Sequence, residues 1–153
     1  MSNSKVLFVL QNAWRRGASP GERDWDDETW ELALWQCQTG KRLREYIPDG
    51  VAFKVINASR DVANNGKAVY SADLDHVTLA IYQYSPDVVV LLGVEAQRLR
   101  RELYDVRILS MAHPCWRELS KVVTAAYRED IDLAIATGAG CQVNWRRDRS
   151  PVP

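Results

Sequence analysis

The sequence is poor in the residues that build metal sites and disulfide frameworks. Of its 153 residues, only three are cysteines (Cys37, Cys115 and Cys141) and only two are histidines (His76 and His113). Three widely spaced cysteines do not make the sets that bind zinc or iron–sulfur clusters, and an odd number does not make a disulfide framework. We therefore expect no metal site.

Long apolar runs and net charge are also missing. No apolar segment approaches the roughly 20 residues needed to cross a bilayer, and residues 1–5 show no signal-peptide pattern. These features predict a cytoplasmic protein with no membrane partner. Lys and Arg together number 20, as do Asp and Glu, so the formal net charge is zero. Since proteins that bind nucleic acid mainly through its phosphates are usually basic, any DNA affinity should be moderate and depend on a local basic patch.

What the chain does contain is an alternation of strand-like and helix-like segments. Apolar runs of buried-strand length occupy 5–10, 51–57, 88–93 and 107–111. Helical patterns occupy 27–37 (continued or followed by a short helix at 41–46), 72–84, 95–103 and a segment from 116 or 118 to about 136. This alternation predicts an α/β domain with a mainly parallel sheet. We assign residues 1–140 to a single domain and 141–153 to a flexible, Arg-rich tail.

Polar side chains follow three of the predicted strands. Gln11 and Asn12 come after the first strand, Asn57 ends the second, and His113 follows the fourth. In open α/β sheets, ligands bind at the carboxyl ends of the strands. We therefore expect these side chains to converge on one site.

The order of these motifs resembles that of the uracil-DNA glycosylase superfamily, over about residues 5–127. A first motif in that family, Gly-Gln-Asp-Pro-Tyr or Gly-Ile-Asn-Pro-Gly, follows a strand, and later motifs are a base-reading Asn, a Leu-Gly pair followed by Ala, and His-Pro-Ser. The matching segments here are Leu10-Gln11-Asn12-Ala13-Trp14, Ile56-Asn57, Leu92-Gly93-Val94-Glu95-Ala96 and His113-Pro114-Cys115. The resemblance implies a three-layer α/β/α fold with a central four-stranded sheet.

The resemblance also implies a reaction, the hydrolysis of the N-glycosidic bond of a flipped pyrimidine without a metal or an organic cofactor. Asn12 would position the attacking water, and His113 would stabilise the negative charge that develops on the leaving base. Asn57 would pair with the Watson–Crick edge of uracil or a modified base. Phe53 or Trp14 would stack on that base.

Gln11 would complete the base-binding residues by similarity. Arg15, Arg16 and Arg117 would hold phosphates that flank the flipped nucleotide. We expect the protein to act as a monomer on DNA.

The first motif departs from the family pattern in three ways. Asn12 replaces the catalytic Asp of the fastest branch, so slow turnover is expected; an Asn occupies this place in the mismatch-specific branch. Ala13 replaces Pro. Trp14 stands where a smaller residue normally borders the pyrimidine C5 position, and its indole either narrows the pocket or swings out to line a larger one.

Two other functions remain open at this stage. The absent carboxylate and the bulky Trp14 also fit a module that recognises a base or nucleotide without cleaving it. An enzyme acting on free nucleotides is disfavoured, since none of the three strand ends presents a carboxylate nucleophile. His76 is expected to be structural, and Trp30 and Trp35 are expected to pack in the core.

Overall fold

The computed structural model describes residues 4–23, 27–137 and 144–145. These residues contain a sheet with the strand order β2-β1-β3-β4-β5, in which every pair is parallel. Its strands are β1 (Lys5–Leu10), β2 (Ala52–Asn57), β3 (Val88–Leu92), β4 (Arg107–Met111) and β5 (Asn144–Trp145). Because all the strands point the same way, their carboxyl ends lie along one edge of the sheet.

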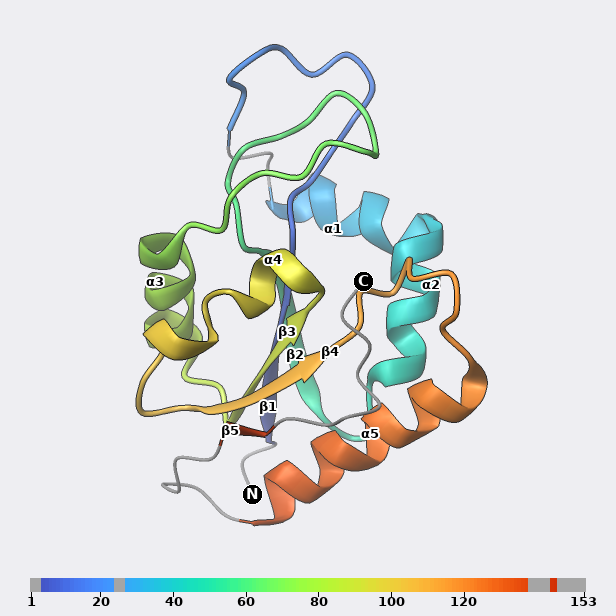
Figure 1. Cartoon of the computed structure of the whole chain (residues 1–153), viewed down its shortest axis with the longest axis vertical. Helices are drawn as coiled ribbons and strands as arrows, with labels where there is room; N and C mark the ends of the chain where they lie inside the picture. The colour runs from blue at the N-terminus through green and yellow to red at the C-terminus, as the bar shows by residue number, and fades with distance from the viewer. Residues whose placement is uncertain (1–3, 24–26, 138–143, 146–153) are drawn as a thin grey trace.

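Helices cover both faces of this sheet (Figure 1). One face carries α3 (Leu74–Tyr84), α4 (Val94–Gln97) and the 3-10 turn η2 (Arg100–Glu102). The other face carries α1 (Asp27–Gln36), α2 (Gln38–Leu43), the 3-10 turn η1 (Arg44–Tyr46) and α5 (Lys121–Ala136). The predicted three-layer α/β/α fold with a parallel central sheet is confirmed.

Alternating side chains of β1 tie the layers together. Val6 and Phe8 pack with Tyr127 of α5, while Leu7 packs with Val77 of α3 on the opposite face. All five side chains are fully buried. Burying a large apolar side chain contributes roughly 1.5–3 kcal/mol, so a continuous apolar run in a central strand stabilises both layers at once.

The helix predicted at 95–103 is broken in the structure. Only Val94–Gln97 is α-helical, and Arg100–Glu102 forms a 3-10 turn. The N–H of Leu99 donates to the carbonyl of Ala96, and the N–H of Glu102 donates to the carbonyl of Leu99. These i to i−3 bonds tighten the chain and bury Leu99 with Leu103 against the sheet, so the prediction of one continuous helix was wrong.

The final helix starts later than the pattern indicated. It begins at Lys121, where the Ser120 side chain caps it by accepting a hydrogen bond from the Val123 N–H. The segment before it makes turns, because Trp116 donates to the carbonyl of His113 and Leu119 donates to that of Trp116. The polar loop that carries His113 is therefore longer than predicted.

A short strand lies in the segment that we assigned to the flexible tail. Asn144 and Trp145 pair with Ile108 and Leu109 of β4, which adds β5 at the edge of the sheet. The rest of 141–153 lies outside the described residues.

None of the described helices is both long enough and apolar enough to cross a membrane.

Candidate functional site

A cavity of about 340 Å³ opens at the carboxyl edge of the sheet. This volume lies at the lower end of the range of ligand sites in proteins, about 300–1,000 Å³. Its polar lining includes Gln11 and Asn12 after β1, Asn57 at the end of β2, His113 after β4 and Thr39 of α2. Four of the side chains that the sequence singled out are thus brought to one cavity, although Gln11 and His113 lie 102 positions apart in the chain.

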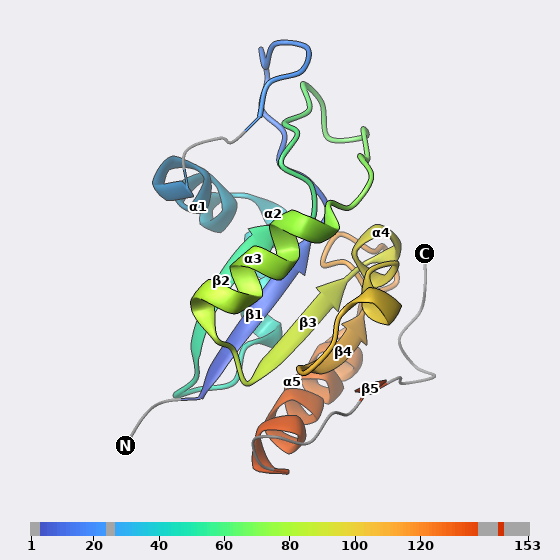
Figure 2. The same ribbon diagram turned by 90° about the vertical axis from the view of Figure 1, so that its left-hand side faces the viewer.

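Two long loops rise from this edge and form one wall of the cavity. Residues 11–23 follow β1 and residues 58–73 follow β2; we call them the paired loops. Both views show them side by side (Figures 1 and 2). The Ala63 N–H donates to the Ala13 carbonyl, and the Arg15 N–H donates to the Ala63 carbonyl, each at 2.9 Å. The loops therefore hold each other through backbone pairing away from the sheet.

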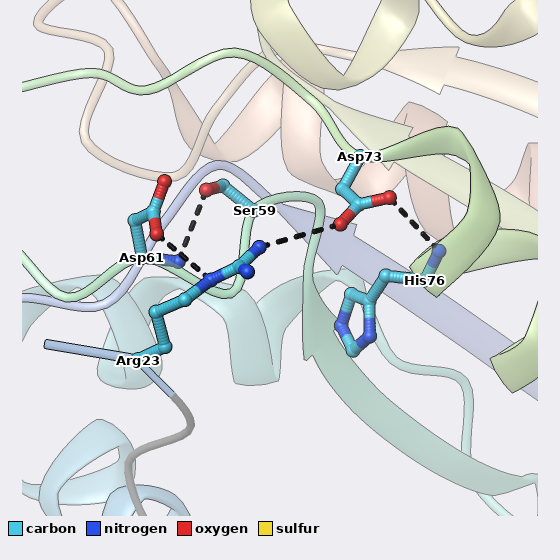
Figure 3. A network of polar contacts seen from close by, with 5 residues as sticks. All are labelled: Arg23, Ser59, Asp61, Asp73 and His76. Atoms are coloured by element: carbon cyan, nitrogen blue, oxygen red, sulfur yellow. Dashed lines mark hydrogen bonds and ion pairs between the residues drawn. The ribbon is translucent and has the colours of Figure 1, made fainter. Parts of the chain in front are cut away.

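An ion-pair cluster fastens the outer side of the paired loops. Figure 3 shows Arg23 between two carboxylates, with nitrogen–oxygen distances of 3.0 Å to Asp61 and 3.7 Å to Asp73. The Ser59 hydroxyl accepts from the Asp61 N–H, and the Asp73 carboxylate caps α3 by accepting from the His76 N–H. This cluster joins the two loops to the start of α3, and His76 enters it through its backbone.

The Asn12 side chain fastens the inner side. Its Oδ1 accepts a hydrogen bond from the Tyr70 N–H at 3.0 Å, and its Nδ2 donates to the carbonyls of Ala68 at 3.2 Å and Ala13 at 3.3 Å. Both amide hydrogens and one lone pair of the oxygen are occupied. Only the second lone pair of Asn12 Oδ1 therefore remains to accept a hydrogen bond from a water molecule.

His113 is held in one tautomer. Its Nδ1 accepts a hydrogen bond from the Cys115 N–H at 3.0 Å, so the proton of the neutral ring sits on Nε2. Burial lowers the pKa of His113 from 6.5 to about 4. The imidazole is therefore neutral at physiological pH and offers a single N–H donor.

Two buried tyrosines anchor the backbone just before His113. The Tyr46 hydroxyl donates to the Ala112 carbonyl at 2.7 Å, and the Ala112 N–H donates to the Tyr127 hydroxyl at 3.1 Å. Both tyrosine side chains are fully buried, and burial is the main cause of the raised pKa of Tyr46. These contacts fix the direction in which the chain leaves β4.

Arg42 of α2 holds the other side of the same loop. Its Nη1 donates to the carbonyl of Pro114 at 3.2 Å and to that of Trp116 at 3.4 Å. A guanidinium that binds two carbonyls restrains the loop more firmly than a single contact would.

Gly93 allows Gln11 and His113 to approach the end of β3. Its φ of 91° lies in the region that favours glycine. A Cβ at this position would lie 3.1 Å from Nε2 of Gln11 and 3.2 Å from Cβ of His113. The glycine of the Leu-Gly motif is thus required by the geometry of the site, because a side chain at position 93 would displace Gln11 and His113.

The amides of Gln11 and Asn57 are available to a ligand. Within the part of the chain that the structure describes, neither side chain forms a hydrogen bond, and both border the cavity. A primary amide presents donors and an acceptor side by side, which is the pattern needed to pair with the edge of a nucleobase.

The two candidate stacking residues differ in position. Trp14 lines the cavity, is 50% exposed and lies against Gly66. Phe53 lies in β2 four residues before Asn57 and packs edge-on against Trp35, with 5.7 Å between the ring centroids. The structure does not bring Phe53 to the cavity, because it sits toward the amino end of its strand.

The three candidate phosphate-binding residues are also unlike one another. Arg15 forms an ion pair with Glu22. Arg16 and Arg117 are exposed, and the described residues include no ion-pair partner for either. Arg16 belongs to the paired loops, and Arg117 lies in the loop after β4.

Cavity residues that the sequence analysis did not assign to the site come mainly from α1, α2 and the second paired loop. Trp30 was expected in the core, yet it is partly buried there and borders the cavity. The remaining unassigned wall residues are Leu10, Ala13, Ala33, Leu34, Cys37, Thr39, Gly66, Ala68, Val69 and Cys115. Three of these residues, Leu10, Ala13 and Cys115, belong to the motifs that carry the family resemblance, whereas the others had no signal in the sequence that pointed to the site.

Two free cysteines border the cavity beside His113. Cys115 Sγ lies 2.7 Å from the Thr39 hydroxyl, and Cys37 Sγ donates to the Leu34 carbonyl at 3.1 Å. The described residues contain no group of three or more His, Cys, Asp or Glu side chains arranged to hold a metal ion.

A second, smaller cavity of about 180 Å³ lies along the free edge of β2, between α1 and α3. His76, Lys54 and Gln83 border it, and it shares Ala13, Trp30 and Asn57 with the first cavity. His76 therefore borders a different cavity from His113.

No protein-family model matches the sequence, and no curated protein matches it.

Proposed function

We propose that the chain is a monofunctional DNA glycosylase that takes a flipped pyrimidine into the cavity at the carboxyl edge of the sheet. The proposal depends on one observation above all: the cavity gathers Gln11, Asn12, Asn57 and a neutral His113. Hydrolysis of an N-glycosidic bond needs stabilisation of the departing base more than it needs a strong nucleophile. A neutral imidazole with one N–H supplies this stabilisation.

In this mechanism His113 donates from Nε2 to the carbonyl oxygen of the base, where negative charge develops as the bond to C1′ breaks. The Cys115 N–H and the tyrosine-held Ala112 keep the donor in place before the substrate arrives. Asn57 reads the Watson–Crick edge of the base. Such fixed donors cost no reorganisation during the reaction.

Asn12 has a restricted part in the reaction. Its free Oδ1 lone pair accepts a hydrogen bond from the attacking water, while its other polar positions stay bonded to the second paired loop. An amide neither removes the proton from water nor offsets positive charge on the sugar. We therefore expect slow turnover, with base departure running ahead of water attack.

The same bonds favour an alternative, a base-recognition module on this fold that does not cleave. Because Asn12 holds Ala68 and Tyr70, its place at the cavity is explained without any catalytic role. Asn12→Asp distinguishes the two functions. An enzyme changes its rate or its range of bases when it gains a carboxylate, whereas a recognition module releases no base before or after the change.

The proposal is tested with labelled oligonucleotides that carry uracil, 5-substituted uracils, mismatched thymine or modified cytosines. Abasic sites are read by alkaline cleavage, and binding to each strand is measured in parallel. Base release from at least one substrate by the wild type, lost in Asn57→Ala, supports the glycosylase. Tight binding to one substrate without release from any supports the recognition module instead.

A further inference from the structure

The outer lip of the cavity is apolar and open to solvent. Trp14 and Val69 both line the cavity, yet they are 50% and 54% exposed. Tyr70, next to Val69, is 38% exposed. Exposed aromatic and aliphatic side chains gathered at one rim are a feature of binding surfaces rather than of scattered surface residues.

The outer lip of the cavity carries few unpaired positive charges. Arg16 and Lys67 of the paired loops are exposed, and neither has an ion-pair partner among the described residues. Of the other three cations of these loops, Arg15 pairs with Glu22 and Arg23 bridges two aspartates. The third, Arg60, borders the smaller cavity beside α3. The unpaired charge beside the aromatic rings is therefore small.

Part of the Trp14 ring packs against Gly66, and half of the residue is exposed to solvent. A Cβ on Gly66 would lie 3.2 Å from Cε2 and 3.3 Å from Cζ2 of the indole, so the ring lies directly on the glycine backbone. Asn12 fixes the segment that carries Tyr70 through its N–H. Both aromatic residues thus lie on loops that hydrogen bonds and packing hold in place. An aromatic ring held in this way loses little conformational entropy when a partner stacks on it.

We infer that this lip, formed by Trp14, Val69 and Tyr70 with Arg16 and Lys67, binds single-stranded DNA beside the flipped base. The inference rests on the proposed function for the kind of polymer and adds the form of the strand. Bases stack on aromatic side chains only where their faces are exposed, as they are in a single strand. Two unpaired cations and a neutral chain give weak phosphate attraction, which disfavours duplex binding through the backbone. A base in a single strand is also the least costly to extrude.

The test uses a fluorescent oligo-dA strand, which holds no pyrimidine for the cavity, and the same strand annealed to oligo-dT. Fluorescence anisotropy should show tighter binding of the single strand than of the duplex. Trp14→Ala should weaken single-strand binding about tenfold or more, while Trp14→Phe should retain most of it. Tyr104→Ala is the matched control, because Tyr104 is 75% exposed on the loop that precedes β4, at the opposite edge of the sheet, and should change nothing.

A second readout does not depend on removing an aromatic ring. Each phosphate contact on a single strand contributes about 0.7 to the slope of log affinity against log salt. Replacing both Arg16 and Lys67 with Gln removes two such contacts and should reduce the magnitude of this slope by about 1.4. Equal or tighter binding of the duplex, or single-strand binding unaffected by Trp14→Ala, overturns the inference even if base release is observed. Trp14-dependent binding of oligo-dA without base release from any substrate keeps the lip and rejects the glycosylase.

Discussion

The backbone N–H of Cys115 donates to Nδ1 of His113 at 3.0 Å, two residues back along the chain. This short loop contact decides which ring nitrogen carries the proton, and burial of the ring disfavours a second proton. The donor that the proposed chemistry needs is thus a consequence of the turn that follows β4.

Activity should be insensitive to pH around neutrality and should fall only in acid. Because the folded-state pKa of His113 is about 4, the acidic limb of the base-release profile should lie near that value rather than near 6.5. Protonation of Nδ1 would break the bond from the Cys115 N–H. A profile of the single-turnover rate against pH checks this, and an acidic limb centred near 6.5 would show that His113 is not buried as described.

The pH dependence of the free energy of unfolding should also reflect the titration of His113. The unfolded chain, with an ordinary His pKa of 6.5, binds more protons than the folded chain between pH 6.5 and about 4. The His113 contribution to the free energy of unfolding is therefore level above pH 6.5 and falls as pH drops, by at most about 3 kcal/mol. Denaturant unfolding of the wild type and His113→Gln measures it as a difference, with His76→Gln as the control. An identical pH dependence in wild type and His113→Gln would contradict the prediction.

Removing either tyrosine hydroxyl should loosen the loop that carries His113. Tyr46→Phe leaves the buried Ala112 carbonyl without its donor, which should cost about 1–3 kcal/mol. Base release should slow about tenfold or more, because small displacements of a reacting group are costly. Chemical denaturation and single-turnover assays measure the two effects. Tyr104→Phe serves as an exposed control, and unchanged rates in Tyr46→Phe would show that this anchor does not position His113.

Gly93→Ala should disturb the site from the sheet side. The φ of 91° is strained for alanine, and the added methyl would meet Gln11 and His113 at 3.1–3.2 Å. We expect a loss of about 1–3 kcal/mol in stability and much reduced base release. Gly50→Ala is the matched control, since its φ is 75° but no atom lies within 4 Å of the added Cβ. If both variants lose stability equally and both retain base release, the close approach at Gly93 does not matter to the site.

Asn12→Asp should lower stability as well as change any base release. An aspartate can still accept from the Tyr70 N–H, but its carboxylate would face the Ala68 carbonyl to which the amide donates. The second paired loop should then be released on one side, at a cost of about 1–3 kcal/mol. Hydrogen exchange of the amides between Gly66 and Tyr70 follows this directly. Unchanged protection there would mean that the Asn12 side chain does not hold the loop.

Strands β1, β3 and β4 could be predicted because their residues, apart from Lys5, are buried on both faces of the sheet, whereas in the edge strand β2 only Val55 and Ile56 are buried. The direction of a parallel sheet then brings the polar residues that follow β1, β2 and β4 to one edge. Phe53, predicted as a candidate for stacking on the base, lies away from that edge because it is near the amino end of β2.

The contacts between distant residues could not be predicted. No spacing rule shows that Tyr46 and Tyr127 bind the two backbone groups of Ala112, or that Asn12 reaches a loop 56 residues later. Helix periodicity likewise did not reveal the 3-10 turns after Ala96, because buried leucines at 99 and 103 fit both geometries.

The most direct test of the proposed chemistry is single-turnover release of the base from the best substrate by the wild type, His113→Ala and His76→Ala. These are the only two histidines, and they lie at different cavities. We predict a loss of about 100-fold or more in His113→Ala, as expected when a donor to developing charge is removed, and a wild-type rate in His76→Ala. Equal rates in all three proteins, or no release by the wild type from any base, would contradict the glycosylase proposal.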